Sequence, residues 1–201
     1  KNQITHISGW AKINTSTLIT VGNQEISTKN IAIATGSKPA SFRGIVADGK
    51  IIVDSTGALN LEEIPKKMVV IGGGVIGLEM GSVFNRLGTK VTVIEYLNQI
   101  AVGMDAEISK SFSRILKKQG IDFILNSAVT DINIKKNLAT VSYQNNSESE
   151  SNNITANVVL IATGRKAHTA GLGLENINLA TNELGQIIVN DKLQTNHPNI
   201  F

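Results

Sequence analysis

The chain has 201 residues, 41% hydrophobic and 4% aromatic, with a formal net charge of +3, which suits one large domain or one and a half ordinary ones. Its 19 lysines and arginines are scattered and accompanied by few aromatic residues, a pattern that disfavours nucleic-acid binding. The lack of cysteine excludes disulfides and thiolate chemistry within this chain, and no apolar run approaches the ~20 residues that span a bilayer, so we expect no membrane insertion.

The first third of the chain predicts β structure followed by an irregular segment. Residues 17–21 (TLITV) and 30–35 (NIAIAT) have strand-like composition, with a polar turn at 22–25 (GNQE) between the first run and the next. Residues 37–66 contain two prolines and three glycines, which favours a linker or crossover there.

From Met68 onward a strand-helix-strand pattern begins. Residues 68–72 (MVVIG) form an apolar run typical of a buried strand, and residues 90–95 (KVTVIE) predict a second strand. Residues 75–87 predict the helix between them, which ends at Gly88 and carries apolar residues at helical spacing: Val75, Leu78, Val83, Phe84 and Leu87.

A second helix and a third strand continue this pattern. Asp105 is a candidate N-cap for a helix that ends at Gly120, with Lys117 and Lys118 near its negative end. The predicted apolar face of this helix is Ile108, Phe112, Ile115 and Leu116. With residues 121–125 as the third strand, the alternation predicts an α/β fold with a parallel sheet covered on both faces.

The remainder of the chain reads differently. Residues 129–134 and 138–143 predict a hairpin, and the polar run 144–153 predicts a solvated loop. Residues 156–164 (ANVVLIATG) predict another buried strand, and 165–201 is loop-rich with one short strand at 186–190. The sequence IATGSK (33–38) recurs as IATGRK (161–166) on either side of the alternating unit, as expected for a nucleotide-binding domain inserted into a second domain.

The glycines after the first buried strand have the spacing of a dinucleotide-binding turn. Gly72, Gly74 and Gly77 fit G-x-G-x-x-G between a predicted strand and a predicted helix. Gly72 allows the tight turn, and Gly74 lets a pyrophosphate approach the helix N-terminus. Gly77 and Gly81 fall on the side of the helix that packs on the sheet.

An acidic residue completes the motif. Glu95 ends the second strand, 23 residues after Gly72, where a carboxylate binds the adenosine ribose 2′-hydroxyl and favours NAD over NADP. No G-K-[ST] follows the glycines, which excludes a P-loop. Glu79 either complements the helix N-terminus or faces the reactive end of the cofactor, and periodicity alone leaves both open.

No self-contained catalytic or metal site is visible. His6, His168 and His197 lack metal-ligand spacing or a nucleophile partner, which favours surface or turn positions. No G-x-S-x-G elbow occurs either.

Four stretches together resemble dihydrolipoamide dehydrogenase, of the pyridine nucleotide-disulfide oxidoreductase family. The first two stretches start with VVIGGGVIGLEMGS (69–82) and DAEISKSFSRILKKQG (105–120). The other two are VVLIATGRK (158–166) and QTNHPNIF (194–201). Residues 164–167 read G-R-K-A where the family often has G-R-[RK]-P.

The resemblance implies an FAD- and NAD-dependent enzyme with a Rossmann-like NAD-binding domain, a parallel sheet with helices plus a β-meander, inserted into parts of an FAD-binding domain. The implied segments are 1–43 for the FAD domain, 44–167 for the NAD domain and 168–201 for the return to the FAD domain. The implied NAD contacts are Gly72, Gly73, Gly74, Val75, Ile76, Gly77, Leu78, Glu79, Glu95, Val129 beside the adenine and Gly164 near the nicotinamide. The implied FAD contacts are Ala11, Thr35, Gly36 and Ser37.

The same resemblance implies that the chain is a central fragment of a longer enzyme, inactive alone because the redox-active cysteines and the catalytic base lie elsewhere. The full-length parent would be a homodimer that serves a lipoyl-bearing protein of a 2-oxoacid dehydrogenase complex, in the cytoplasm or, in a eukaryote, the mitochondrial matrix. A related NADH-dependent flavoprotein oxidase and a non-catalytic NAD-binding module are the alternatives.

Overall fold

The computed structural model describes residues 2–147 and 150–201, which form two compact units. Unit 2 comprises residues 39–164, and unit 1 comprises the two flanking stretches, 1–38 and 165–201. The units divide at 38/39 and 164/165, whereas the resemblance implied domain boundaries at 43/44 and 167/168.

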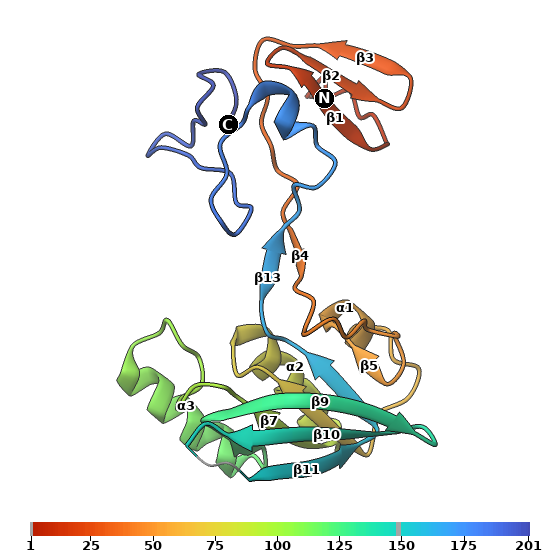
Figure 1. Ribbon diagram of the computed structural model, residues 1–201, viewed down its shortest axis with the longest axis vertical. Coiled ribbons are helices and arrows are strands. Elements are labelled where there is room, and N and C mark those ends of the chain that lie inside the picture. Colours follow the sequence, from red (N-terminus) through yellow and green to blue (C-terminus); the bar gives the residue numbers. More distant parts are fainter. Residues whose placement is uncertain (1, 148–149) are drawn as a thin grey trace. The chain divides into compact units, whose positions relative to one another are not determined.

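Unit 2 is built on a parallel sheet of five strands (Figure 1). In sheet order they are β5 (Ile52–Val53), β12 (Val158–Ile161), β6 (Lys67–Ile71), β7 (Lys90–Ile94) and β8 (Asp122–Ile124). The last four confirm the strands predicted from apolar runs. The α/β fold class is likewise confirmed.

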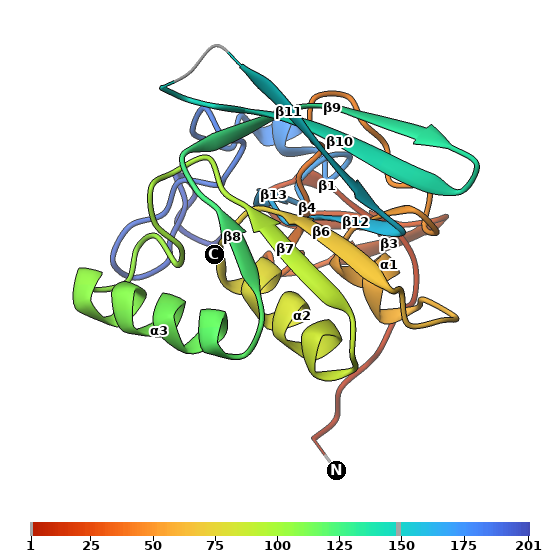
Figure 2. The ribbon, with the colours of Figure 1, turned by 90° about the horizontal axis from the view of Figure 1, so that it is seen from below.

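The two faces of this sheet are covered by different structures (Figure 2). One face carries α1 (Ser55–Leu59), α2 (Val75–Arg86) and α3 (Ala106–Lys118). The other carries an antiparallel meander of β9 (Ser127–Lys135), β10 (Leu138–Asn145) and β11 (Ser151–Ala156). Along β6, Met68 and Val70 face the helices whereas Val69 and Ile71 face the meander, as the two-residue strand period requires.

Two glycines allow α2 to lie close to the sheet. Gly77 and Gly81 are buried with Leu78 and Phe84, and a Cβ at Gly77 would meet the Gly72 carbonyl and lie 3.0 Å from Val70. This confirms the packing role predicted for both glycines. The helix predicted from the apolar spacing is confirmed, but Val75, Val83 and Leu87 of that apolar set are exposed.

Helix α3 begins where its cap predicts but buries a narrower stripe than expected. The Asp105 carboxylate accepts hydrogen bonds from the backbone N–H groups of Glu107 and Ile108 at 2.9 and 3.4 Å. Of the predicted face, Leu116 is buried, whereas Ile108, Phe112 and Ile115 are exposed. The other buried residue of the helix is Ser109, whose hydroxyl donates to the Ala101 carbonyl at 3.3 Å.

Unit 1 holds an antiparallel sheet of β1 (Ala11–Thr15), β2 (Leu18–Val21) and β3 (Gln24–Ser27). The 3₁₀ helix η1 (Leu174–Ile177) packs on β1, and the Asn176 side chain donates to the Ile13 carbonyl at 2.7 Å. A two-stranded ribbon of β4 (Ser37–Pro39) and β13 (Arg165–Ala167) lies where the chain passes between the units.

Several local predictions are wrong in unit 1. Residues 30–35 form a single bridge, between Ile31 and Ile200, and their backbone hydrogen bonds to the end of the chain reach only residues 199 and 201. Residues 186–190 also contribute a single bridge, Ile187 to Thr181. The turn expected at 22–25 is shorter, since Gln24 already pairs with Val21 and Gly22 supplies the positive φ of 59°.

Two predicted loops in unit 2 contain regular structure. The segment 37–66 includes β5 and α1, which are too short for periodicity to reveal, and the Asp54 side chain caps α1 through the Gly57 N–H at 2.8 Å. In the predicted loop 144–153, Gln144 pairs with Ser151, so the described ends of that run extend the β10–β11 hairpin, while residues 148–149 lie outside the described part. Polar residues occur there because the strand β11 is at the edge of the meander.

Asp48 organises the turn that leads into β5. Its Oδ1 accepts hydrogen bonds from the N–H groups of Lys50, Ile51 and Ile52 at 2.8, 2.8 and 3.0 Å. Desolvation raises the pKa of this carboxyl, but the three N–H donors and the Lys50 charge together outweigh it, and the pKa falls below its ordinary value of 3.8.

We expect Gly77→Ala to lower the free energy of unfolding by about 1–3 kcal/mol, because its Cβ overpacks the contact between α2 and β6. Urea denaturation followed by circular dichroism measures the change. Gly74→Ala is the matched control, because a Cβ at Gly74 meets nothing within 4 Å. Equal unfolding midpoints for the two variants would contradict this packing constraint.

We expect Asp48→Asn to destabilise the chain at neutral pH but not in acid. The lowered pKa means that the charged carboxylate stabilises the fold above pH 3.8, and this contribution is lost as the pH falls through the folded pKa. Urea midpoints of wild type and variant should therefore converge in acid. Asp131→Asn, at an exposed carboxylate of β9, is the control, and a gap that persists in acid would refute the assignment.

Candidate functional site

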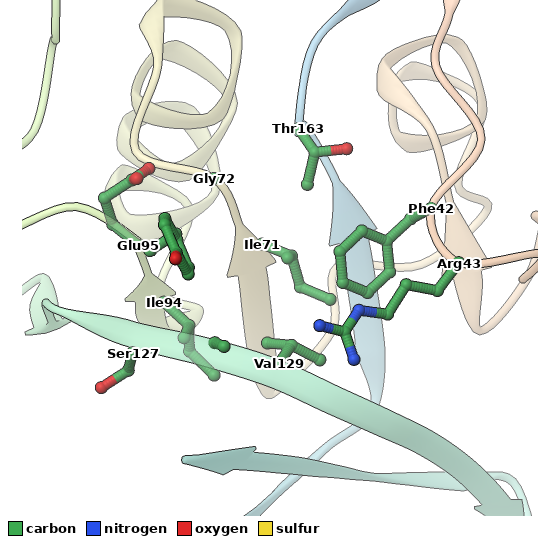
Figure 3. Close-up of a pocket in the computed structure, with 11 residues that line it drawn as sticks. Phe42, Arg43, Ile71, Gly72, Ile94, Glu95, Ser127, Val129 and Thr163 are labelled. Carbon is green, nitrogen blue, oxygen red and sulfur yellow. The ribbon is translucent and has the colours of Figure 1, made fainter. Parts of the chain in front are cut away.

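The candidate site lies at the carboxyl ends of the parallel strands, where ligands bind open α/β sheets. A cleft of about 270 Å³ opens there, bordered by the ends of β6, β7 and the start of β9 (Figure 3). Its lining residues are Phe42, Arg43, Ile71, Gly72, Ile94, Glu95, Tyr96, Ser127, Ala128, Val129 and Thr163. Three residues singled out from the sequence, Gly72, Glu95 and Val129, thus meet at one cleft.

The turn from β6 into α2 passes so close to the end of β12 that it needs glycine. Gly72 has a φ of +107°, and a Cβ there would lie 2.5 Å from the Ala162 carbonyl oxygen. Its N–H donates to the Ile94 carbonyl at 2.9 Å, which ties the turn to the end of β7. The turn is therefore fixed by backbone contacts to both neighbouring strands.

The N-terminus of α2 has no side-chain cap. Gly74 is the N-cap residue in extended conformation, without a capping hydrogen bond, and a Cβ there would meet nothing within 4 Å. The first-turn N–H groups of a helix lack intrahelical partners, and the helix dipole favours negative charge at this end. A phosphate or pyrophosphate group fits this arrangement.

Glu95 is tied to the glycine turn. Its Oε2 accepts a hydrogen bond from the Gly73 N–H at 2.5 Å, and its Oε1 accepts one from the Leu97 N–H at 2.9 Å. Each carboxylate oxygen keeps further acceptor capacity, which hydroxyl groups of a ligand can use. The carboxylate therefore both holds the turn and presents negative charge to the cleft.

The remaining helix residues of the predicted site follow from this turn. Val75, Ile76, Gly77 and Leu78 form the first turn of α2, in which Gly77 and Leu78 are buried. Glu79 is exposed in the second turn and does not line the cleft. Because the dipole effect fades within the first turn, its position does little to complement the helix N-terminus.

Other predicted site residues do not join this cleft. Gly164, with a φ of +135°, follows β12 but is absent from the lining. Ala11, Thr35, Gly36 and Ser37 belong to unit 1, so their role as FAD contacts stays a prediction. Within unit 1, Arg165 holds Ser37 by a bond from Nε to Oγ of 2.6 Å and a second one from Nη2 to the Ser37 carbonyl.

Several lining residues were not singled out from the sequence. Thr163 belongs to the repeated IATG sequence, and Ile71 and Ile94 end the two strands, so strand ends were the available signal. Phe42 and Arg43 come from a segment that was predicted as an irregular linker, and no motif marks them.

The histidines take structural positions. His197 Nε2 lies 2.6 Å from the Ile177 carbonyl oxygen, and His168 lies edge-on to Trp10 with ring centroids 6.1 Å apart. Within residues 2–147 and 150–201, no three acidic or histidine side chains are grouped so that they could hold a metal ion. In the same residues, no helix has the length and apolarity required to cross a membrane.

Comparison with known proteins identifies relatives over the whole chain. The family model described as pyridine nucleotide-disulphide oxidoreductase matches residues 1–201. Mitochondrial dihydrolipoyl dehydrogenases from Pongo abelii and Homo sapiens are each 46% identical over the full chain, which spans 41% of their length. The solved HOCl-induced flavoprotein disulfide reductase RclA from Escherichia coli, as its Cu(II) complex, is 36% identical with a TM-score of 0.84, covering 96% of this chain and 44% of that one.

We expect the Gly73 amide proton to resonate far downfield in the ligand-free chain, because its short bond to a carboxylate strongly deshields it. In Glu95→Ala the resonance should move upfield, as ¹H–¹⁵N correlation spectra will show. Glu79→Ala, at the exposed carboxylate of α2, should leave it in place. A Gly73 shift that is the same in all three proteins would contradict the bond.

Proposed function

The chain belongs to the pyridine nucleotide-disulphide oxidoreductase family, and we propose that it is the NAD-binding part of a dihydrolipoamide dehydrogenase, with some contacts to FAD. The parent enzyme oxidises dihydrolipoamide with NAD, through FAD and a redox disulfide outside this chain. The observation that carries the proposal is the bond from Gly73 to Glu95, which ties the glycine turn that precedes α2 to the acidic strand end, beside a cleft that Gly72 and Glu95 both line.

The residues present fit the parts of NAD. The uncapped first turn of α2, at Val75 and Ile76, offers backbone N–H groups to the pyrophosphate, and Gly74 leaves the approach open. Glu95 accepts from the adenosine ribose hydroxyls and repels the 2′-phosphate of NADP by its charge. Val129, in the cleft wall, lies beside the adenine.

The other predicted contacts serve the reactive end. When bound, NAD and FAD supply the hydride-transfer chemistry, and the protein supplies orientation and electrostatics. In this proposal Gly164 lies near the nicotinamide, and Glu79 faces the junction of nicotinamide and flavin rather than the cleft. The FAD contacts come from Ala11 and residues 35–37, where Arg165 holds Ser37 in place.

The proposal extends to partners and compartment. A lipoyl-bearing protein of a 2-oxoacid dehydrogenase complex would deliver the substrate to a homodimeric parent enzyme. The dihydrolipoyl dehydrogenases from Pongo abelii and Homo sapiens are named mitochondrial, which supports the mitochondrial matrix if the source is eukaryotic. In any other source, the parent enzyme would be in the cytoplasm.

Calorimetric titration of the chain with NADH and NADPH tests the proposal. We expect tighter binding of NADH, and we expect Glu95→Ala to weaken NADH binding about ten- to a hundredfold, the contribution of hydrogen bonds to a charged group. Glu95→Gln keeps an acceptor for the Gly73 N–H but lacks the charge, so it should mainly narrow the preference for NADH over NADPH.

Asp122→Asn is the matched control, because this carboxylate begins β8, pairs with Lys90 at 3.8 Å and does not line the cleft. It should bind both nucleotides as the wild type does. Equal wild-type affinities for NADH and NADPH would overturn the role of Glu95. No binding of either nucleotide by a folded chain would overturn the assignment of the cleft.

A further inference from the structure

One wall of the cleft is a tight turn outside the sheet. The Ile45 N–H donates to the Phe42 carbonyl at 2.8 Å, and the two residues between them, Arg43 and Gly44, have φ values of +46° and +76°. Positive φ at both central residues is typical of a type I′ turn. A non-glycine residue in this region is uncommon, so the turn holds Arg43 in a conformation that arginine rarely adopts.

Both side chains of this turn reach the cleft. Phe42 is half-buried and packs against the core between the sheet and the meander, which includes Ile71 and Val129. The Arg43 guanidinium lies 6.0 Å from the centroid of the Phe42 ring, within the range of a cation–π contact. The Phe42 ring thus fixes the turn to the core and contacts the Arg43 guanidinium at the cleft wall.

Arg43 carries the positive charge of the cleft lining, and Glu95 carries the negative charge. Figure 3 shows them at opposite sides, with Ile71, Ile94 and Val129 between them. In residues 2–147 and 150–201, no hydrogen bond or ion pair of the Arg43 guanidinium is found, whereas Glu95 is bound to the glycine turn. The guanidinium donors are therefore available to a ligand.

The space between these two charges suits one end of a dinucleotide. Its volume of about 270 Å³ is just below the roughly 300–1,000 Å³ of sites that enclose a whole ligand. Its floor is apolar, whereas riboses and phosphates are polar, so a planar base is the part of NAD that fits. With the ribose at Glu95, the adjoining base is adenine, and a guanidinium stacks well on such a ring.

We propose that Phe42 and Arg43 form one wall of an adenine slot whose apolar floor includes Val129, and that Arg43 stacks its guanidinium on the base. This inference rests on the proposed function, because it assumes that the cleft binds NAD. It makes Arg43 a specificity-determining residue for the adenine half of the cofactor, in a segment that carries no nucleotide-binding motif.

Binding of two mononucleotides tests the adenine half and the nicotinamide half of the site separately. AMP and nicotinamide mononucleotide each carry one ribose and one phosphate and differ in the base. Binding of NADH, AMP and nicotinamide mononucleotide to the 201-residue chain is measured by NMR titration, for wild type and for Arg43→Ala, Arg43→Lys and Arg114→Ala. Arg114, exposed on α3, is the charge-matched control because it does not line the cleft.

We expect Arg43→Ala to weaken the binding of NADH and of AMP by the same factor, about five- to fiftyfold, which corresponds to the loss of one base-stacking contact. Binding of nicotinamide mononucleotide should not change. Arg43→Lys should restore little of the lost affinity, because an ammonium group keeps the positive charge but lacks the planar guanidinium that stacks on a base. Arg114→Ala should match the wild type for every ligand.

Other outcomes overturn the inference in distinguishable ways. Equal losses for AMP and nicotinamide mononucleotide, restored by lysine, would make Arg43 a phosphate counter-ion, and the proposed function would stand. Wild-type binding by Arg43→Ala would remove Arg43 from the site, again without touching the function. A wild-type chain that binds neither NADH nor AMP would overturn both proposals.

Discussion

The candidate cleft depends on the absence of one side chain where α2 crosses the end of β6. The helix can lie against the Gly72 carbonyl only because Gly77 has no Cβ, and Gly72 can turn beneath the Ala162 carbonyl for the same reason. This close packing aims the first turn of the helix across the carboxyl ends of the strands. The electrostatic properties of the site, open N–H groups and a favourable dipole, are thus consequences of a steric fit.

Glu95 combines a structural task with the ligand-binding task that we propose for it. Its hydrogen bonds to the N–H groups of Gly73 and Leu97 hold the glycine turn against the end of β7, before any nucleotide arrives. A ligand therefore meets an acceptor that is already oriented, which reduces the ordering cost of binding. Because the same carboxylate contributes charge to the cleft, the shape of the glycine turn and the proposed preference for NAD are coupled at this position.

The sequence was sufficient for those parts whose physics is local. Four of the five strands of the parallel sheet, α2, the Asp105 cap of α3 and the packing of Gly77 all follow from periodicity, capping and steric rules that act over a few residues. What could not be predicted depends on distant partners. Exposure of Ile108 and Val83 depends on where each helix rests on the sheet, and residues 30–35 failed to form a strand for lack of an extended pairing partner. The Phe42–Arg43 wall was missed because only the tertiary fold brings this turn to the cleft.

The two ends of unit 2 lie next to each other, since the Ala40 N–H donates to the Gly164 carbonyl at 3.0 Å. For the folding of unit 1, the whole of unit 2 therefore acts as a closed hairpin loop, whatever its number of residues. Once unit 2 has folded, the entropy lost in joining the two halves of unit 1 is that of a short connection, and it no longer grows with the length of the insert. An inserted domain of this kind can lengthen, shorten or be replaced during evolution at little thermodynamic cost to its host.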